Sequence, residues 1–231
     1  MNFIRKKGCD TMKSFISKLK DPGSAITHFI AFIGALLATT PLLVKAYQGE
    51  HRNYLGAFAV FILSMAALYA ASTIYHTFDI SEKINTLLRK IDHSMIFVMI
   101  AGSYTPVCLI ALPKNVGIPL LITVWIITIV GTLFKIFWIT CPRWLSSAMY
   151  IGMGWLSILA ISSLVKGLTP SAFAWLLLGG IIYTIGGVIY ALKLPLFKKV
   201  NWKNFGNHEL FHCFVMLGSV CHFVMVYNYL A

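Results

Sequence analysis

The chain has 231 residues, of which 58% are hydrophobic and 11% are charged, and its formal net charge is +12. Because a soluble domain carries about 25% charged residues, this composition excludes a soluble protein. The distribution of the basic residues, described below, indicates a membrane topology and argues against a nucleic-acid-binding role.

Seven continuous apolar runs are each long enough to cross the hydrocarbon core of a bilayer as a helix, which takes roughly 20 residues. Their continuous apolarity also excludes a membrane β-barrel, whose strands alternate between apolar and polar residues. We therefore predict an all-α integral membrane protein, a seven-transmembrane-helix bundle, with spans at residues 24–44, 55–75, 94–112, 116–138, 145–165, 172–192 and 208–230.

The Lys and Arg residues predict the orientation of this bundle. Fifteen of the 19 lie in the N-terminal tail or in the second, fourth and sixth connections, and four lie on the opposite side. The positive-inside rule then predicts a cytoplasmic N-terminus and an outer C-terminus. Because the basic side would contact anionic headgroups, membrane lipids are the expected partners.

Residues 1–23 form a predicted cytoplasmic basic amphipathic tail, followed by one membrane domain at residues 24–231. Residues 12–20 suit either a short helix on the inner membrane surface or a disordered basic segment, and Asp21-Pro22-Gly23 ends it. Between the second and third spans, Asp79 to Glu82 has capping-box spacing with Asp79 as the N-cap. An amphipathic helix over 84–91 should then lie on the cytoplasmic face, and Pro106 should kink or end the third span.

Polar side chains from three distant segments fall at one membrane level in this topology. The second span runs inward and ends near Ser72 and His76, the third begins near Asp92, and the seventh begins with His208 and His212. The last two are four residues apart and therefore share a helix face. Ionisable residues within a membrane are costly, and their default interpretation is a functional site.

Three of these residues, His76, His208 and His212, make up the His₃ set that catalytic zinc uses together with one open position. We predict that they bind Zn²⁺. Asp92 is the candidate to hold or deprotonate a water molecule, and Ser72 is the candidate to hydrogen-bond that water or an oxyanion.

The other histidines are weaker candidates. His28, near the inner end of the first span, is a candidate to contact a ligand side chain, although a membrane histidine is more often a packing residue. His222 lies about 21 Å deeper than His208 and cannot share its metal. His93 lies about 100° around the helix from Asp92, so we do not expect both to face the metal.

The string His208-Glu209-Leu210-Phe211-His212 also matches a zinc-protease pattern in which Glu209 would be the general base. We interpret Glu209 instead as an acidic residue that stabilises the first helical turn, with Asn207 as the N-cap. An intramembrane protease that uses upstream ligands stays open as an alternative.

These strings resemble the hemolysin III family, the bacterial branch of the group that includes the adiponectin and progestin receptors. The matching pieces are Ser72-x-x-x-His76, Ile91-Asp92-His93, the run from Ala101 to Pro106, Met153-Gly154-Trp155, and His208 to His212 with Gly218-Ser219 and His222-Phe223. They extend over nearly the whole membrane domain.

The resemblance implies a seven-helix fold in the bacterial cell membrane, with zinc held by His76, His208 and His212 and with Asp92 and Ser72 beside it. For the receptor branch, hydrolysis of ceramide-type lipid amides has been proposed. The expected function is therefore a zinc-dependent hydrolase of a lipid amide or ester that acts from the inner leaflet. Two alternatives stay open: a pore-forming cytolysin, which the family name suggests, and a membrane sensor with structural zinc.

Overall fold

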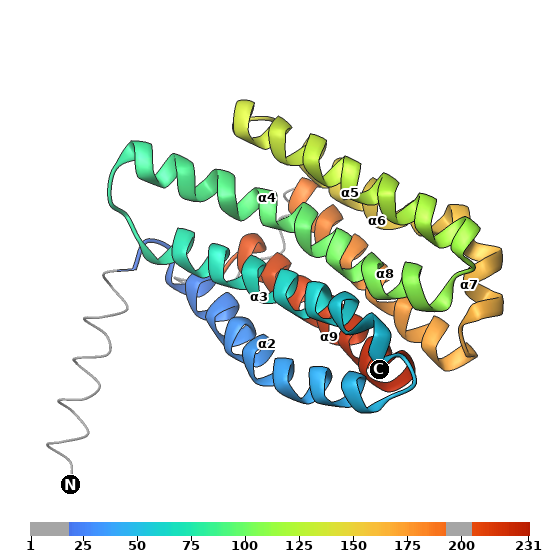
Figure 1. Cartoon of the computed structure of the whole chain (residues 1–231). Coiled ribbons are helices and arrows are strands. Elements are labelled where there is room, and N and C mark those ends of the chain that lie inside the picture. The colour runs from blue at the N-terminus through green and yellow to red at the C-terminus, as the bar shows by residue number, and fades with distance from the viewer. Residues whose placement is uncertain (1–18, 193–204) are drawn as a thin grey trace, which may run out of the picture.

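The computed structural model describes residues 19–192 and 205–231, and within these ranges seven helical segments are long and apolar enough to cross a membrane (Figure 1). This confirms the predicted seven-helix membrane bundle. The helix expected over residues 12–20 lies almost entirely outside the described residues. The described elements are α2 (Pro22–Gln48), α3 (Leu55–Thr77), α4 (Glu82–Pro106), α5 (Lys114–Phe137), α6 (Arg143–Gly154), α7 (Ile161–Gly167), α8 (Pro170–Leu192) and α9 (Asn207–Tyr229), with the 3₁₀ turns Arg52–Tyr54 and Trp155–Ala160 and the π-helical turn Val107–Ala111.

The packing order brings the first and last spans together. Helix α2 packs on α3, α3 on α4, and α4 on α5, while α6 packs on α8 and α8 on α9. The contact between α2 and α9 closes the arrangement. The N-terminal end of α9 therefore lies near the N-terminal end of α2 and the C-terminal end of α3, as Figure 1 shows.

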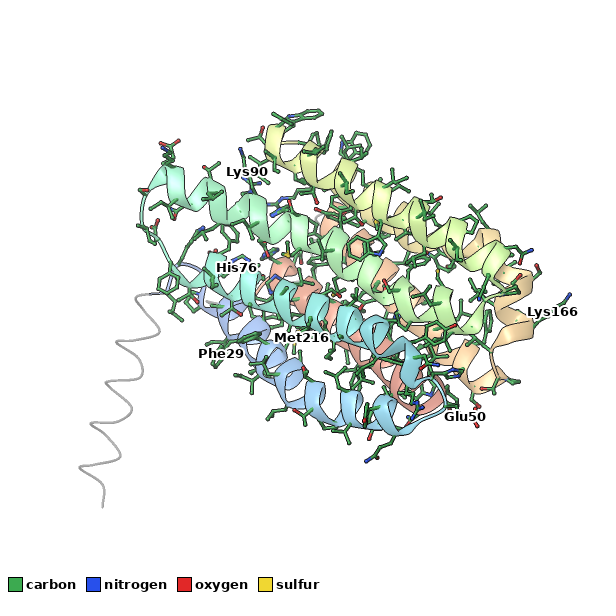
Figure 2. The ribbon with its side chains drawn as sticks, in the orientation of Figure 1. Phe29, Glu50, His76, Lys90, Lys166 and Met216 are labelled. Atoms are coloured by element: carbon green, nitrogen blue, oxygen red, sulfur yellow. The ribbon has the colours of Figure 1, made fainter. Side chains whose placement is uncertain are left out.

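Charged residues gather at the two ends of the bundle, and apolar side chains cover its sides. In Figure 2, His76 and Lys90 lie toward one end, and Glu50 and Lys166 lie at the other. Large aliphatic side chains on the outside of α5 are exposed by 42–60%, with Ile129 at 60%. Such an apolar exterior matches lipid rather than water.

Helix α4 differs from the prediction at its start. It is one unbroken helix from Glu82, so the amphipathic segment at 84–91 is its first part rather than a separate surface helix. The N-cap is Ser81, whose hydroxyl accepts a hydrogen bond from the Ile84 amide, whereas Asp79 accepts one from Asn85. No Gly or Pro interrupts residues 82–101, and the helix therefore continues into the membrane.

The third and fifth spans contain irregular turns. Past Pro106 the regular α-helix gives way to the π-helical turn Val107–Ala111, as the proline predicts. The fifth span is interrupted by the 3₁₀ turn Trp155–Ala160, which the sequence did not reveal. There the Tyr104 hydroxyl donates to the Gly154 carbonyl at 2.6 Å and accepts from the Ser157 amide at 2.9 Å, so a side chain satisfies backbone groups that the break releases.

Helices α3 and α4 approach closely at Gly102. A Cβ atom there would lie 1.9 Å from Ser64 Oγ and 2.7 Å from Ser64 Cβ. We expect Gly102→Ala to destabilise the protein by about 1–3 kcal/mol, because the two helices must separate. Gly152→Ala is the matched control, since its new methyl group would meet no atom within 4 Å. Thermal unfolding in detergent measures both variants, and equal midpoints would contradict the close packing.

Candidate metal centre

Three histidine rings converge where α3 ends and α9 begins. His76 is in the last turn of α3, and His208 and His212 occupy the first turns of α9. Each offers one ring nitrogen, and these three atoms lie within 4.8 Å of one another. Within the described ranges, the group of side chains here that could hold a metal ion consists of these three residues. The structure therefore brings together the three histidines that the sequence singled out.

The distance between the ring nitrogens of His76 and His208 fits two ligands of one zinc ion. His76 Nε2 lies 3.2 Å from His208 Nε2. Two nitrogen ligands about 2.0–2.1 Å from one tetrahedral zinc are separated by about 3.3 Å. His76 and His212 are 2% exposed and His208 is partly exposed, so two of the three rings are shielded from bulk solvent. Neutral imidazoles are the form in which histidine binds a metal, and an apolar environment favours that form.

Asp21 orients the ring of His76. Its Oδ2 lies 2.9 Å from His76 Nδ1, and its backbone amide donates to the His76 carbonyl, also at 2.9 Å. With the carboxylate as acceptor, Nδ1 carries the proton and Nε2 presents its lone pair to the cluster. The pKa of the Asp21 carboxyl lies below its ordinary value, mainly because His76 hydrogen-bonds to it. Carboxylate–histidine pairs of this kind are typical of metal sites.

Helix α2 also contacts the second ligand helix. Thr27 Oγ1 lies 3.2 Å from His212 Nδ1, and the ring of His28 stacks on the ring of His212 with centroids 3.6 Å apart. His28, which the sequence marked as a candidate contact, thus touches a cluster residue. Both ring nitrogens of His28 are buried and have no hydrogen-bond partner in the described part of the chain.

Sequence reasoning missed Asp21 and Thr27 as contacts of the cluster. Asp21 was interpreted only as part of a helix-breaking string. One signal was available: Asp21, at the predicted cytoplasmic end of the first span, is one of only seven acidic residues in the chain. Thr27 carries no comparable signal, because a threonine in a membrane helix usually bonds its own backbone, as Thr27 also does to Gly23 and Ser24.

The carboxylate of Glu209 accepts two hydrogen bonds at the start of α9. One carboxylate oxygen accepts a hydrogen bond from Ser24 Oγ at 2.5 Å, and the other accepts one from the Gly206 amide at 2.8 Å. These contacts match the interpretation of Glu209 as a residue that stabilises the first helical turn. The expectation for Asn207 was wrong by one residue, because α9 begins at Asn207 and the N-cap position belongs to Gly206.

A cavity of about 190 Å³ opens beside the cluster. At this end its lining includes Ser72, Asp92 and His28 together with His208 and His212. Ser72 and Asp92 are almost fully buried, at 1% and 7% exposure. The two predicted catalytic side chains therefore face the same cavity as two of the predicted ligands.

Asp92 is paired with its neighbour His93. The distance from Asp92 Oδ2 to His93 Nδ1 is 3.3 Å, and the same nitrogen lies 2.9 Å from the Arg89 carbonyl. His93 lines the cavity but is not one of the three cluster residues. Its backbone carbonyl accepts a hydrogen bond from Tyr150, which joins α4 to α6.

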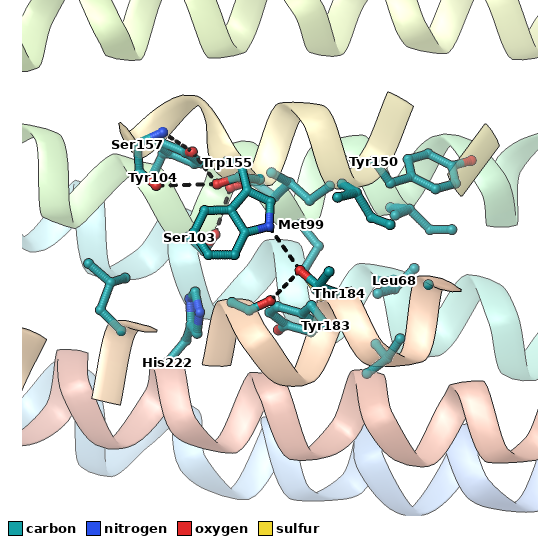
Figure 3. A pocket seen from close by; sticks show the side chains of 18 of the residues that line it. Leu68, Met99, Ser103, Tyr104, Tyr150, Trp155, Ser157, Tyr183, Thr184 and His222 are labelled. Atoms are coloured by element: carbon teal, nitrogen blue, oxygen red, sulfur yellow. Dashed lines mark hydrogen bonds between the residues drawn. The ribbon is translucent and has the colours of Figure 1, made fainter. Parts of the chain in front are cut away.

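The cavity continues between α4, α8, α9 and the broken fifth span. Figure 3 shows Tyr104, Trp155, Thr184 and His222 around it, with Trp155 Nε1 donating to Thr184 Oγ1 at 2.9 Å. Most of the remaining lining is aliphatic or aromatic. His222 packs on Tyr183 with ring centroids 5.3 Å apart and does not belong to the cluster, as its depth predicted.

The family model described as "Haemolysin-III related" matches residues 16–223. The chain belongs to the hemolysin III family. It is 36% identical over 206 residues to the Hemolysin-3 homolog of Bacillus subtilis (strain 168), covering 89% of this chain and 92% of that protein. It is 38% identical over 207 residues to Hemolysin-3 of Bacillus cereus, covering 89% and 90%.

The hemolysin III chain also has a eukaryotic relative. It is 26% identical over 230 residues to the adiponectin receptor protein of Drosophila melanogaster, which covers 91% of this chain and 51% of the receptor. The chain thus spans about half the length of that receptor. Family and apolar helices together identify a multi-pass membrane protein of the bacterial cell membrane.

The hydrogen bond from His76 to Asp21 yields a first test of the metal centre. We expect Asp21→Asn to lower the affinity for zinc by about 10–100-fold, because the amide is a weaker acceptor and no longer fixes the ring. The affinity is measured by competition with a chromophoric chelator. Asp79→Asn is the control, since Asp79 bonds only Asn85 in the described structure. Equal zinc affinities for the two variants would show that Asp21 does not act on the site.

Proposed function

We propose that this hemolysin III protein is a zinc-dependent hydrolase of a lipid amide or ester, with its metal near the cytoplasmic leaflet. One observation carries the proposal: two of the three convergent imidazoles, a buried carboxylate and a buried hydroxyl line the same predominantly apolar cavity. A site built only to hold a metal for structural reasons has no need of a substrate-sized space beside its ligands.

Each of these residues has its own role in the proposed hydrolysis. His76, His208 and His212 would hold zinc, which supplies a Lewis acid for the carbonyl oxygen and makes water a better nucleophile. Asp92 accepts the proton of the attacking water and passes it to the leaving amine or alcohol. His93, 3.3 Å from Asp92, keeps that carboxylate in place. Ser72 hydrogen-bonds the oxyanion that forms at the carbonyl.

The apolar part of the cavity supports a lipid as substrate. Between α4, α8 and α9 the cavity is lined by apolar residues such as Met99, Leu176 and Val215, which would contact the hydrocarbon part of a lipid. The polar groups lie at the predicted cytoplasmic end, so the reacting carbonyl would lie near the inner headgroup level. Exclusion of water by the bundle strengthens the electrostatic interactions at that position.

Membrane lysis is the alternative that the family name raises. The name Hemolysin-3 belongs to the Bacillus cereus relative, and the name attributes lysis to that protein. A pore needs polar side chains at successive depths around a water path. In the described ranges, the Asp and His residues that line the cavity gather at one end, except for His222, which lies deeper.

Substitution of Asp92 tests the hydrolase proposal. We expect Asp92→Asn to reduce hydrolysis of a short-chain fluorescent ceramide in mixed micelles by about 10²–10⁴-fold, because proton transfer is lost. Zinc content should stay at the wild-type level, since Asp92 is not among the three ligands. Glu209→Gln serves as control and should retain activity within a few-fold.

Three outcomes would contradict the proposal. Wild-type protein with bound zinc and no turnover of lipid amides or esters would favour a sensor with structural zinc. Leakage of vesicles that is equal for wild type and His208→Ala would favour a cytolysin. Loss of activity in Glu209→Gln with full activity in Asp92→Asn would favour the protease arrangement.

A further inference from the structure

His222 lies deep in the cavity and outside the metal centre. Its ring lines the cavity, and both of its ring nitrogens are buried without a hydrogen-bond partner in the described part of the chain. Figure 3 shows this side chain pointing from α9 into the space beside Tyr183. A Cβ atom at Gly179 would lie 2.1 Å from His222 Cδ2, so the glycine on α8 leaves the room that the ring occupies.

Other polar side chains around this part of the cavity do have partners. The Tyr104 hydroxyl and the Trp155 indole make the hydrogen bonds described above, and the Tyr183 hydroxyl lies 2.9 Å from Ser219 Oγ. Buried polar groups are normally hydrogen-bonded, and an exception in a native structure calls for an explanation. Of the cavity-lining side chains just named, only His222 has hydrogen bonds still to be made.

The surroundings of His222 select the chemistry of the missing partner. Within the described ranges no Asp or Glu oxygen lies within 4.0 Å of this ring, and a charge without a counter-charge is costly inside a membrane bundle. A neutral imidazole has one N–H donor and one acceptor nitrogen. A hydroxyl group both donates and accepts, so it can bond either nitrogen in either tautomer. A carboxylate can only accept and would bring a buried charge, which disfavours it.

One cavity connects His222 with the candidate metal centre. Asp92 and His208 line it at the predicted cytoplasmic end, and His222 lies about 21 Å deeper along α9. Apolar side chains such as Met99 and Val215 also line the cavity. This separation is comparable to the length of a long fatty acyl chain. A carbonyl at the metal centre and a hydroxyl at His222 would therefore belong to one long-chain molecule.

We propose that His222 forms a second polar subsite of the cavity, which binds a hydroxyl group carried far along the hydrocarbon chain of a lipid. A chain without this hydroxyl leaves the imidazole unpaired, so the subsite selects hydroxylated chains over plain ones. The inference names a feature of the substrate, and it rests on the proposed function in one respect, that a lipid occupies the cavity. His222 takes no part in the chemistry at the metal centre.

Binding of three fatty acids to the full-length protein in detergent tests the subsite. Competition with a fluorescent fatty acid measures the affinities of palmitic acid, ω-hydroxypalmitic acid and β-hydroxypalmitic acid. We expect the affinity for the ω-hydroxy acid relative to palmitic acid to fall about tenfold in His222→Leu, because the hydroxyl loses its partner. Partitioning of each acid into micelles is the same for both proteins and cancels in this comparison. The β-hydroxy acid is the control, since its hydroxyl lies beside the carboxyl group, and its relative affinity should not change.

A second variant and the thermal midpoints separate binding from folding. His222→Gln keeps a hydrogen-bonding side chain and should retain part of the preference, while both variants should unfold near the wild-type midpoint because no described hydrogen bond is lost. An unchanged preference in His222→Leu, or no binding of any of the three acids, would overturn the proposal. So would lower midpoints in both variants together with weaker binding of palmitic acid itself, which would mark a packing residue.

The outcome is separate from that of the hydrolase test, because binding is measured without turnover. A preference that depends on His222 in a protein that hydrolyses no lipid would contradict the proposed function and leave the subsite in place. Hydrolysis of lipids with no such preference would overturn the subsite alone.

Discussion

The hydrogen bond between His76 Nδ1 and Asp21 Oδ2 connects the start of the first span to the end of the second, and the geometry of the candidate metal centre depends on it. It fixes which nitrogen of His76 faces the cluster. It also anchors α2 so that Thr27 and His28, two turns further on, meet His212 on the last span. Three segments far apart in sequence are thereby held to one geometry. Without such contacts, the buried rings of His76 and His212 would lack the partners that orient them.

The rest of the bundle forms the cavity that lies beside the three histidines. Residues of the broken fifth span and of the π-helical turn after Pro106, such as Trp155 and Cys108, line the cavity. Tyr104 supports one of these irregular turns by bonding to the released backbone groups. The result is an apolar cavity with ionisable groups concentrated at one end. Such an arrangement suits a lipid whose polar part lies at the headgroup level, which is the basis of the proposed hydrolase activity.

Much of this could be predicted from the sequence because membrane constraints are simple. Span length and charge asymmetry predicted the seven helices and a common level for His76, Asp92 and His208. The rise of an α-helix per residue separated His222 from the cluster by depth. Features that depend on tertiary contact could not be predicted. The hydrogen bond from His76 to Asp21 follows from no periodic pattern in the sequence, and the capping positions of α4 and α9 were each misplaced by one or two residues.

The central claim is that His76, His208 and His212 together bind one zinc ion. Metal analysis of purified protein by mass spectrometry, after removal of loosely bound ions, tests it most directly. The account predicts about one zinc per chain for wild type, and strong loss in each of the three single alanine variants while His222→Ala keeps its zinc. Wild-type protein without zinc, or alanine variants with unchanged zinc content, would contradict it.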